Sequence, residues 1–82
     1  MSSAKLYVGN LSYETSQASL RTLFERHGEV VSVSLITDRQ TGRSKGFAFV
    51  EMGTPEQAQA AKSALDGAQL DGRSLKLDDA RE

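Results

Sequence analysis

An eight-residue segment, residues 45–52 with the sequence KGFAFVEM, constrains the fold of this 82-residue chain more than any other feature. Successive side chains of an extended strand point to opposite faces, so one face of the segment holds Ala48, Val50 and Met52. The opposite face holds four side chains of mixed character: Lys45, Phe47, Phe49 and Glu51. A core face would not carry Lys and Glu, and an ordinary solvent face would not carry two phenylalanines. The segment therefore predicts a strand that packs one face on a core and displays two aromatic rings to a stacking partner.

The same segment resembles the longer signature of the RNA-recognition motif family, Lys/Arg-Gly-Phe/Tyr-Gly/Ala-Phe-Val-any-Phe/Tyr. Only Met52 departs from this signature, and alternation places Met52 on the core face, so the departure concerns packing. Residues 6–11, LYVGNL, resemble the family's shorter signature, and the two occur in the family's order and spacing. The resemblance covers residues 5–81, and two linked motifs of this length are a strong signal. It implies a single-domain protein that binds single-stranded RNA, similar to the bacterial members of the family.

Length and composition predict one domain over residues 1–82, with a core between about residues 5 and 80. The absence of cysteine excludes disulfides and thiolate metal sites, and a single histidine, His27, excludes a histidine cluster. We therefore expect neither a metal nor a cofactor. No apolar run approaches the roughly 20 residues that cross a bilayer, and the first residues lack a basic segment leading into an apolar one. We expect a cytoplasmic, unprocessed monomer.

The charge balance argues mildly against a nucleic-acid partner, because 10 basic and 11 acidic side chains give a formal net charge of −1. The distribution softens this objection. Residues 1–50 hold six basic and four acidic side chains, whereas the remainder holds four basic and seven acidic ones. We expect binding that depends more on stacking than on long-range attraction.

The first half of the chain predicts a strand over residues 5–9, a helix that Ser16 caps, and a second strand over residues 30–36. The helix carries one apolar face, formed by Leu20, Leu23 and Phe24. It ends before Gly28. The second strand alternates, with an inner face formed by Val31, Val33 and Leu35. A polar loop over residues 38–42 leads into the aromatic strand.

The second half predicts another helix and a last strand. Thr54 caps this helix, Pro55 suits its first turn, and Gln57 completes a capping box. Its small-residue face is formed by Ala58, Ala61, Ala64 and Leu65. Residues 70–73 form a turn, and the alternation of Leu75 and Leu77 with polar residues predicts the strand.

This element order predicts an α+β fold: a ferredoxin-like two-layer sandwich, β-α-β-β-α-β, with a four-stranded antiparallel sheet and both helices on one face. The other face of the sheet stays open. The resemblance implies that the two signature strands lie side by side in the centre, which would place Tyr7, Phe47 and Phe49 on one exposed patch.

This patch is the candidate site, and on it bases of single-stranded RNA would stack. Lys45, Arg43, Lys5 and Lys76 are candidates for pairing with phosphates. Candidates for reading base edges are Asn10, Ser32, Ser34 and the segment of residues 78–81, which ends at Arg81. Asn10 also suits a simple turn-forming role after the strand. Three acidic residues on or near this face should repel phosphate and could accept hydrogen bonds from base amino groups: Glu51, Asp78 and Asp79.

The remaining aromatic residues, Tyr13 and Phe24, are assigned to packing, and His27 to a structural position at a helix end. We predict no enzyme, because the sequence offers no Ser-His-acid set and no glycine-rich phosphate loop. Two alternatives stay open. A protein-interaction module on the same fold would tolerate loss of Phe47 and Phe49, and a small hydrolase would keep turnover without them. Single-stranded DNA is a further possible ligand, because stacking tolerates either sugar.

Overall fold

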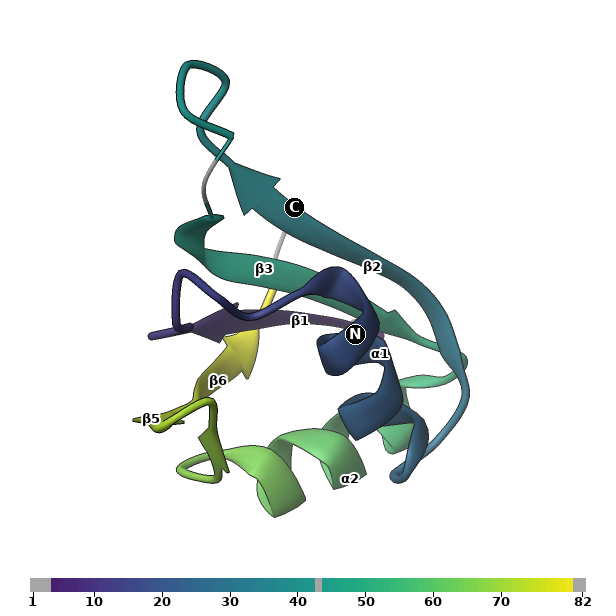
Figure 1. The fold of residues 1–82 in the computed structure, drawn as a ribbon. Helices are drawn as coiled ribbons and strands as arrows, with labels where there is room; N and C mark the ends of the chain where they lie inside the picture. Colours follow the sequence, from purple (N-terminus) through teal and green to yellow (C-terminus); the bar gives the residue numbers. More distant parts are fainter. Residues whose placement is uncertain (1–3, 43, 81–82) are drawn as a thin grey trace.

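The computed structural model describes residues 4–42 and 44–80, and of residues 44 and 45 it describes the backbone only (Figure 1). The elements follow the order β1 (Lys5–Gly9), α1 (Gln17–Glu25), β2 (Val30–Thr37), β3 (Ser44–Met52), α2 (Pro55–Leu65), β4 (Gln69–Leu70), β5 (Arg73–Ser74) and β6 (Lys76–Asp79). Four strands form an antiparallel sheet in the order β2-β3-β1-β6. Figure 1 shows α1 and α2 covering one face of this sheet. The predicted fold class and the central position of β1 and β3 are confirmed.

The core lies between this covered face and the helices. It contains the predicted inward residues of β1 and β3, all of them no more than 1% exposed: Leu6, Val8, Ala48, Val50 and Met52. Met52 is therefore a core residue, as alternation predicted. From the helix side, Leu20 and Phe24 of α1 are fully buried, and Leu23 packs partly buried against the same cluster.

Both helices begin where their capping residues predict. The Ser16 side chain accepts a hydrogen bond from the Ser19 backbone N–H at 3.1 Å, and Thr54 accepts from the Gln57 N–H at 3.1 Å. The capping box at Thr54 is only half formed. The side-chain oxygen of Gln57 instead accepts from the backbone N–H of Glu29 at 3.2 Å. This bond ties the start of α2 to the segment before β2, a tertiary contact that overrides the local motif.

The predicted small-residue face of α2 is wrong at one position. Ala58, Ala61 and Leu65 are buried, whereas Ala64 is exposed. Successive helical residues are rotated by about 100°, so Ala64 lies on the flank of the stripe that its neighbour Leu65 occupies. Only one stripe of α2 packs on the sheet.

The predicted inner face of β2 is wrong at Val31, which is 53% exposed. The pairing of β2 with β3 shifts register between Val30 and Ser32, because β2 contains an extra residue there. The inward and outward positions before this shift are therefore exchanged, and Val30 is buried in place of Val31. Beyond this bulge the prediction holds, because Val33 is buried and Leu35 packs against the core.

Tyr13 is also not a packing residue, since it is 70% exposed in the turn after β1. The predicted turn at residues 70–73 is the tip of a short hairpin, β4–β5, which forms a separate two-stranded sheet. Asp71 and Gly72 at this tip both have positive φ, +52° and +82°, as a tight two-residue hairpin turn requires.

Candidate nucleic-acid interface

Three aromatic rings meet in the middle of the open sheet face. Tyr7 of β1 lies directly opposite Phe49 of β3, because the two strands pair antiparallel in that register. The ring centroids of Tyr7, Phe47 and Phe49 are separated by 5.9 to 6.1 Å in every pair. We call these three residues the aromatic platform. The predicted grouping of the three rings is thus what the backbone register produces.

The rings of the platform hold one another in place. The planes of Tyr7 and Phe47 are tilted by 30°, whereas Phe49 forms T-shaped pairs with both, at interplanar angles of 63° and 85°. Such edge-to-face pairs at centroid separations of about 4.5–7 Å are favourable. All three residues are partly buried, although within residues 4–42 and 44–80 no helix or strand covers this face of the sheet. A ligand that stacks here finds rings that are already ordered.

The side chain of Tyr7 packs over the backbone of Gly9. A Cβ atom at Gly9 would lie 2.8 Å from both Cε1 and the hydroxyl oxygen of Tyr7, so the ring extends along β1 over this glycine. This role of Gly9 was not predicted from the sequence. Its signal is the spacing of the two residues, since positions i and i+2 of a strand share one face.

We predict that Gly9→Ala lowers the affinity for RNA about three- to tenfold, because the added methyl group displaces the Tyr7 ring and weakens one stacked base. The free energy of unfolding should change by less than about 1 kcal/mol, since only the far end of the exposed-face Tyr7 side chain must move and no backbone atom is met. A double-mutant cycle of Gly9→Ala with Tyr7→Ala measures whether the loss of RNA affinity acts through the Tyr7 ring. If Gly9→Ala still weakens binding in the Tyr7→Ala background, the glycine acts in some other way.

Lys5 and Lys76 lie at opposite ends of the platform. The Lys5 ammonium group is 5.5 Å from the centroid of the Phe49 ring, within the range of a cation–π contact. Lys76 is exposed on β6 directly opposite Gly9, and therefore beside the outer end of the Tyr7 ring. Both lysines thus reach the surface where the sequence analysis placed them.

The side chain of Asn10 forms hydrogen bonds with residues of the β4–β5 hairpin. Its Nδ2 donates to the carbonyl oxygen of Ser74 at 2.6 Å, and its Oδ1 accepts from Nη2 of Arg73 at 2.7 Å. Its φ of +59° turns the chain out of β1. Thr15 adds a second link to the same hairpin by donating to Asp71 Oδ2 at 2.8 Å. These contacts fit the turn-forming role of Asn10 and hold β4–β5 beside the end of β1.

The remaining predicted contacts divide into two groups. Ser32 and Ser34 of β2 are exposed and lie opposite Glu51 and Phe49, so both flank the platform on the β2 side. Arg43, Arg81 and the side chain of Lys45 lie outside the described residues. The backbone of Lys45 belongs to β3 and leads into Gly46, whose φ of +90° favours glycine.

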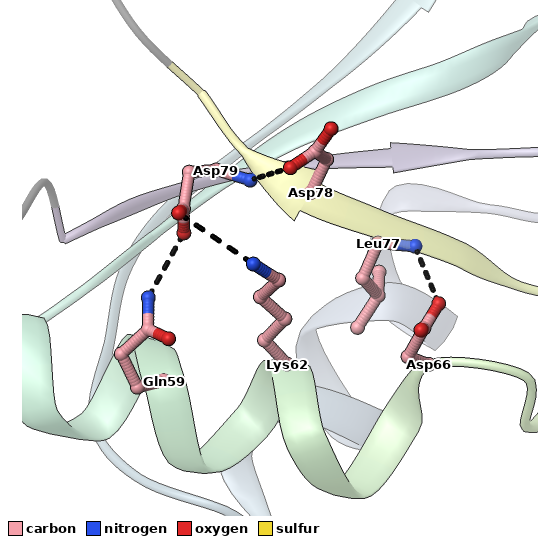
Figure 2. Close-up of polar contacts among 6 residues, drawn as sticks. All are labelled: Gln59, Lys62, Asp66, Leu77, Asp78 and Asp79. Carbon is pink, nitrogen blue, oxygen red and sulfur yellow. Dashed lines mark hydrogen bonds and ion pairs between the residues drawn. The ribbon is translucent and has the colours of Figure 1, made fainter.

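The three acidic residues do not share one face. Asp79 turns to the helices, where its carboxylate accepts from Gln59 Nε2 at 2.9 Å and pairs with Lys62 Nζ at 3.5 Å (Figure 2). Its expected position near the binding face is therefore wrong, because Asp79 lies opposite the inward residue Leu6. Asp78 lies opposite Tyr7, and Glu51 lies opposite Lys5, both exposed.

Comparison with known proteins identifies the family. The sequence model of the RNA recognition motif matches residues 6–76, so the chain belongs to this family. It is 51% identical to RbpA of Nostoc sp. (strain PCC 7120 / SAG 25.82 / UTEX 2576) over 76 residues, which are 93% of this chain and 74% of RbpA.

Solved structures agree with this assignment. The crystal structure of RNA-binding protein PG1 matches with a TM-score of 0.92 and 42% identity, over 98% of this chain and 96% of that chain. The structure of the Rna15 RRM with bound RNA (GU) matches with a TM-score of 0.88 and 34% identity, over 98% of this chain and 85% of that chain. The resemblance seen in the two signature segments is confirmed.

Residues 4–42 and 44–80 contain no group of three or more histidine, cysteine, aspartate or glutamate residues that could hold a metal ion. No helix within the same ranges is long and apolar enough to cross a membrane.

Proposed function

We propose that this chain binds single-stranded RNA by stacking bases on the aromatic platform while its lysine and arginine side chains pair with phosphates. The observation that carries the proposal is the cluster of three rings, about 6 Å apart, on a sheet face that no helix or strand of the described residues covers. Proteins recognise unpaired bases by this kind of stacking. The membership of the RNA recognition motif family supports the same partner.

The energetics favour a binding module of moderate affinity. Each stacked base contributes about 1–3 kcal/mol, so two bases supply about 2–6 kcal/mol. A dissociation constant of 1 μM corresponds to about 8 kcal/mol. Phosphate pairing has to supply the difference, and we assign it to Lys5 and Lys76 at the ends of the platform, together with Arg43, Lys45 and Arg81. The exposed Ser32 and Ser34 are in reach of base edges on the β2 side.

We assign this activity to a monomer in the cytoplasm with a post-transcriptional role. Stacking on the platform requires only one copy of the chain, because all three rings come from β1 and β3. The proposed activity is binding without catalysis. Its partner, single-stranded RNA, is exposed to such proteins after transcription, which supports this assignment.

The proposal is tested by fluorescence anisotropy with a pool of labelled eight-nucleotide RNAs, used single-stranded and annealed to their complements. We expect single strands to bind at least tenfold more tightly, because paired bases are not free to stack on the rings. We also expect the logarithm of the binding constant to fall with the logarithm of the salt concentration with a slope no steeper than about −3.5, because the five cations pair with at most about five phosphates. Equal binding of duplexes, or a slope near −5, would contradict a mechanism dominated by stacking.

A further inference from the structure

Asp78 lies at the side of the aromatic platform. It pairs with Tyr7 across β1 and β6, and side chains of directly paired residues share a face, with Cβ atoms about 5 Å apart. Its neighbours in β6 point the other way, since Leu77 is buried and Asp79 contacts α2. Figure 2 shows the Asp78 carboxylate on the side of β6 that faces away from α2. Asp78 therefore places a negative charge beside the Tyr7 ring.

A base stacked on Tyr7 would have one edge next to β6. That edge would lie between two side chains of opposite charge, Asp78 and Lys76. The Tyr7 ring extends from its own backbone position over Gly9, and the β6 partners of these two residues are Asp78 and Lys76. A base that covers this ring reaches both positions with the same edge. Lys76 offers only donors, whereas the Asp78 carboxylate offers only acceptors.

The carboxylate of Asp78 is oriented and has capacity for another partner. Its Oδ1 accepts a hydrogen bond from the backbone N–H of Asp79 at 2.8 Å. Among the residues that the structure describes, Oδ2 has no hydrogen-bond partner, and the side chain is exposed. The internal bond fixes the direction of the carboxylate, so a ligand group meets an acceptor in a defined place.

From this arrangement we infer that Asp78 selects the base stacked on Tyr7, favouring cytosine, adenine and guanine over uracil. The first three bases carry an exocyclic amino group, which can donate to the carboxylate, and Asp or Glu accepting from the cytosine N4 amino group is a known pairing. Where cytosine carries its N4 amino group, uracil carries the carbonyl oxygen O4, and two acceptors facing each other repel; the N3–H donor of uracil lies between two carbonyl oxygens. This inference rests on the proposed function, because it requires a base on the platform.

The test compares two RNAs that differ in this group, oligocytidine and oligouridine of eight nucleotides. We expect the wild-type chain to bind oligocytidine about tenfold more tightly, the range of one hydrogen bond to a charged group near the surface. In Asp78→Ala the two affinities should differ by less than about twofold. The uridine complex should also tighten in this variant, because the repelling oxygen atoms are gone.

Asp79→Ala is the matched control. It removes the same charge one residue away, but from the side of β6 that faces α2, so the preference for cytidine should persist. Thermal melts confirm that both variants are folded. Retained discrimination in Asp78→Ala, or none in the wild type, overturns the inference and leaves the proposed function standing. Failure of the folded wild type to bind any of these RNAs or the mixed pool overturns both.

Discussion

Replacing both Phe47 and Phe49 by alanine is expected to lower the affinity for single-stranded RNA about 100-fold. The two rings would support two stacked bases at about 1–3 kcal/mol each, so a 100-fold change, about 2.7 kcal/mol, lies in the lower part of the range of about 2–6 kcal/mol. The fold should survive, because both rings lie on the open face and are only partly buried. Fluorescence anisotropy measures the affinity, and circular dichroism measures the fold and its melting temperature.

Tyr13→Ala is the control for this double variant. It also removes an aromatic ring, 70% exposed, from the turn outside the sheet. Its affinity for RNA should match that of the wild type within about twofold, since no stacked base is lost. If the Phe47→Ala/Phe49→Ala variant is folded and binds RNA as the wild type does, the open face is not the RNA surface. The protein-interaction alternative would then be favoured.

The second large effect is expected for Phe24→Ala, which should lower the free energy of unfolding by about 3–5 kcal/mol. Phe24 is fully buried and is the largest side chain in the core. Small domains have about 5–15 kcal/mol in total, so this loss removes much of the stability. The melting temperature should fall by at least about 12 °C. Urea denaturation followed by circular dichroism measures the change.

Leu23→Ala provides the comparison for the core. Leu23 is the neighbouring apolar residue of α1, but it is only partly buried, so its loss should cost less than half as much. A cost below about 1 kcal/mol for Phe24→Ala would show that α1 does not hold the core as the structure places it.

Strand alternation predicted which side chains of the two signature strands share a face, because both strands are regular, and the family resemblance implied that the strands are neighbours. In the structure Tyr7 pairs with Phe49, and the buried Val8 and Val50 fix which face points inward. A one-residue slip would expose the entire inner face, so the register is strongly specified. For this reason the two short segments were enough to predict that the three rings lie on the open face of the sheet.

The failures occur where a non-local contact overrides a local pattern. Val31 is exposed because β2 contains a bulge, and an extra residue in one strand leaves no clear mark in an alternating apolar run. Gln57 bonds the backbone of Glu29 instead of its own helix start. Asn10 is engaged by Arg73 and Ser74, which are more than 60 positions away in the sequence. None of these partners can be found by reading neighbouring residues.

The acidic residues at the site itself differ from these cases. Asp78 and Asp79 are adjacent in the sequence, and the sequence analysis treated them alike. Their pairing with Tyr7 and Leu6 places them on opposite faces of β6, so one lies beside the platform and the other contacts α2. Alternation from the buried Leu77 gives the same assignment, so this difference between the two aspartates was present in the sequence pattern.

The most direct test of the account is an NMR titration of the ¹⁵N-labelled chain with an eight-nucleotide single-stranded RNA. The account predicts that the largest amide shift changes lie in β1 and β3, with smaller ones along β6 beside Tyr7, while α1 and α2 are little affected. This pattern would place the RNA on the open face of the sheet. Changes concentrated in α1 and α2, with Tyr7, Phe47 and Phe49 unperturbed at saturation, would contradict it.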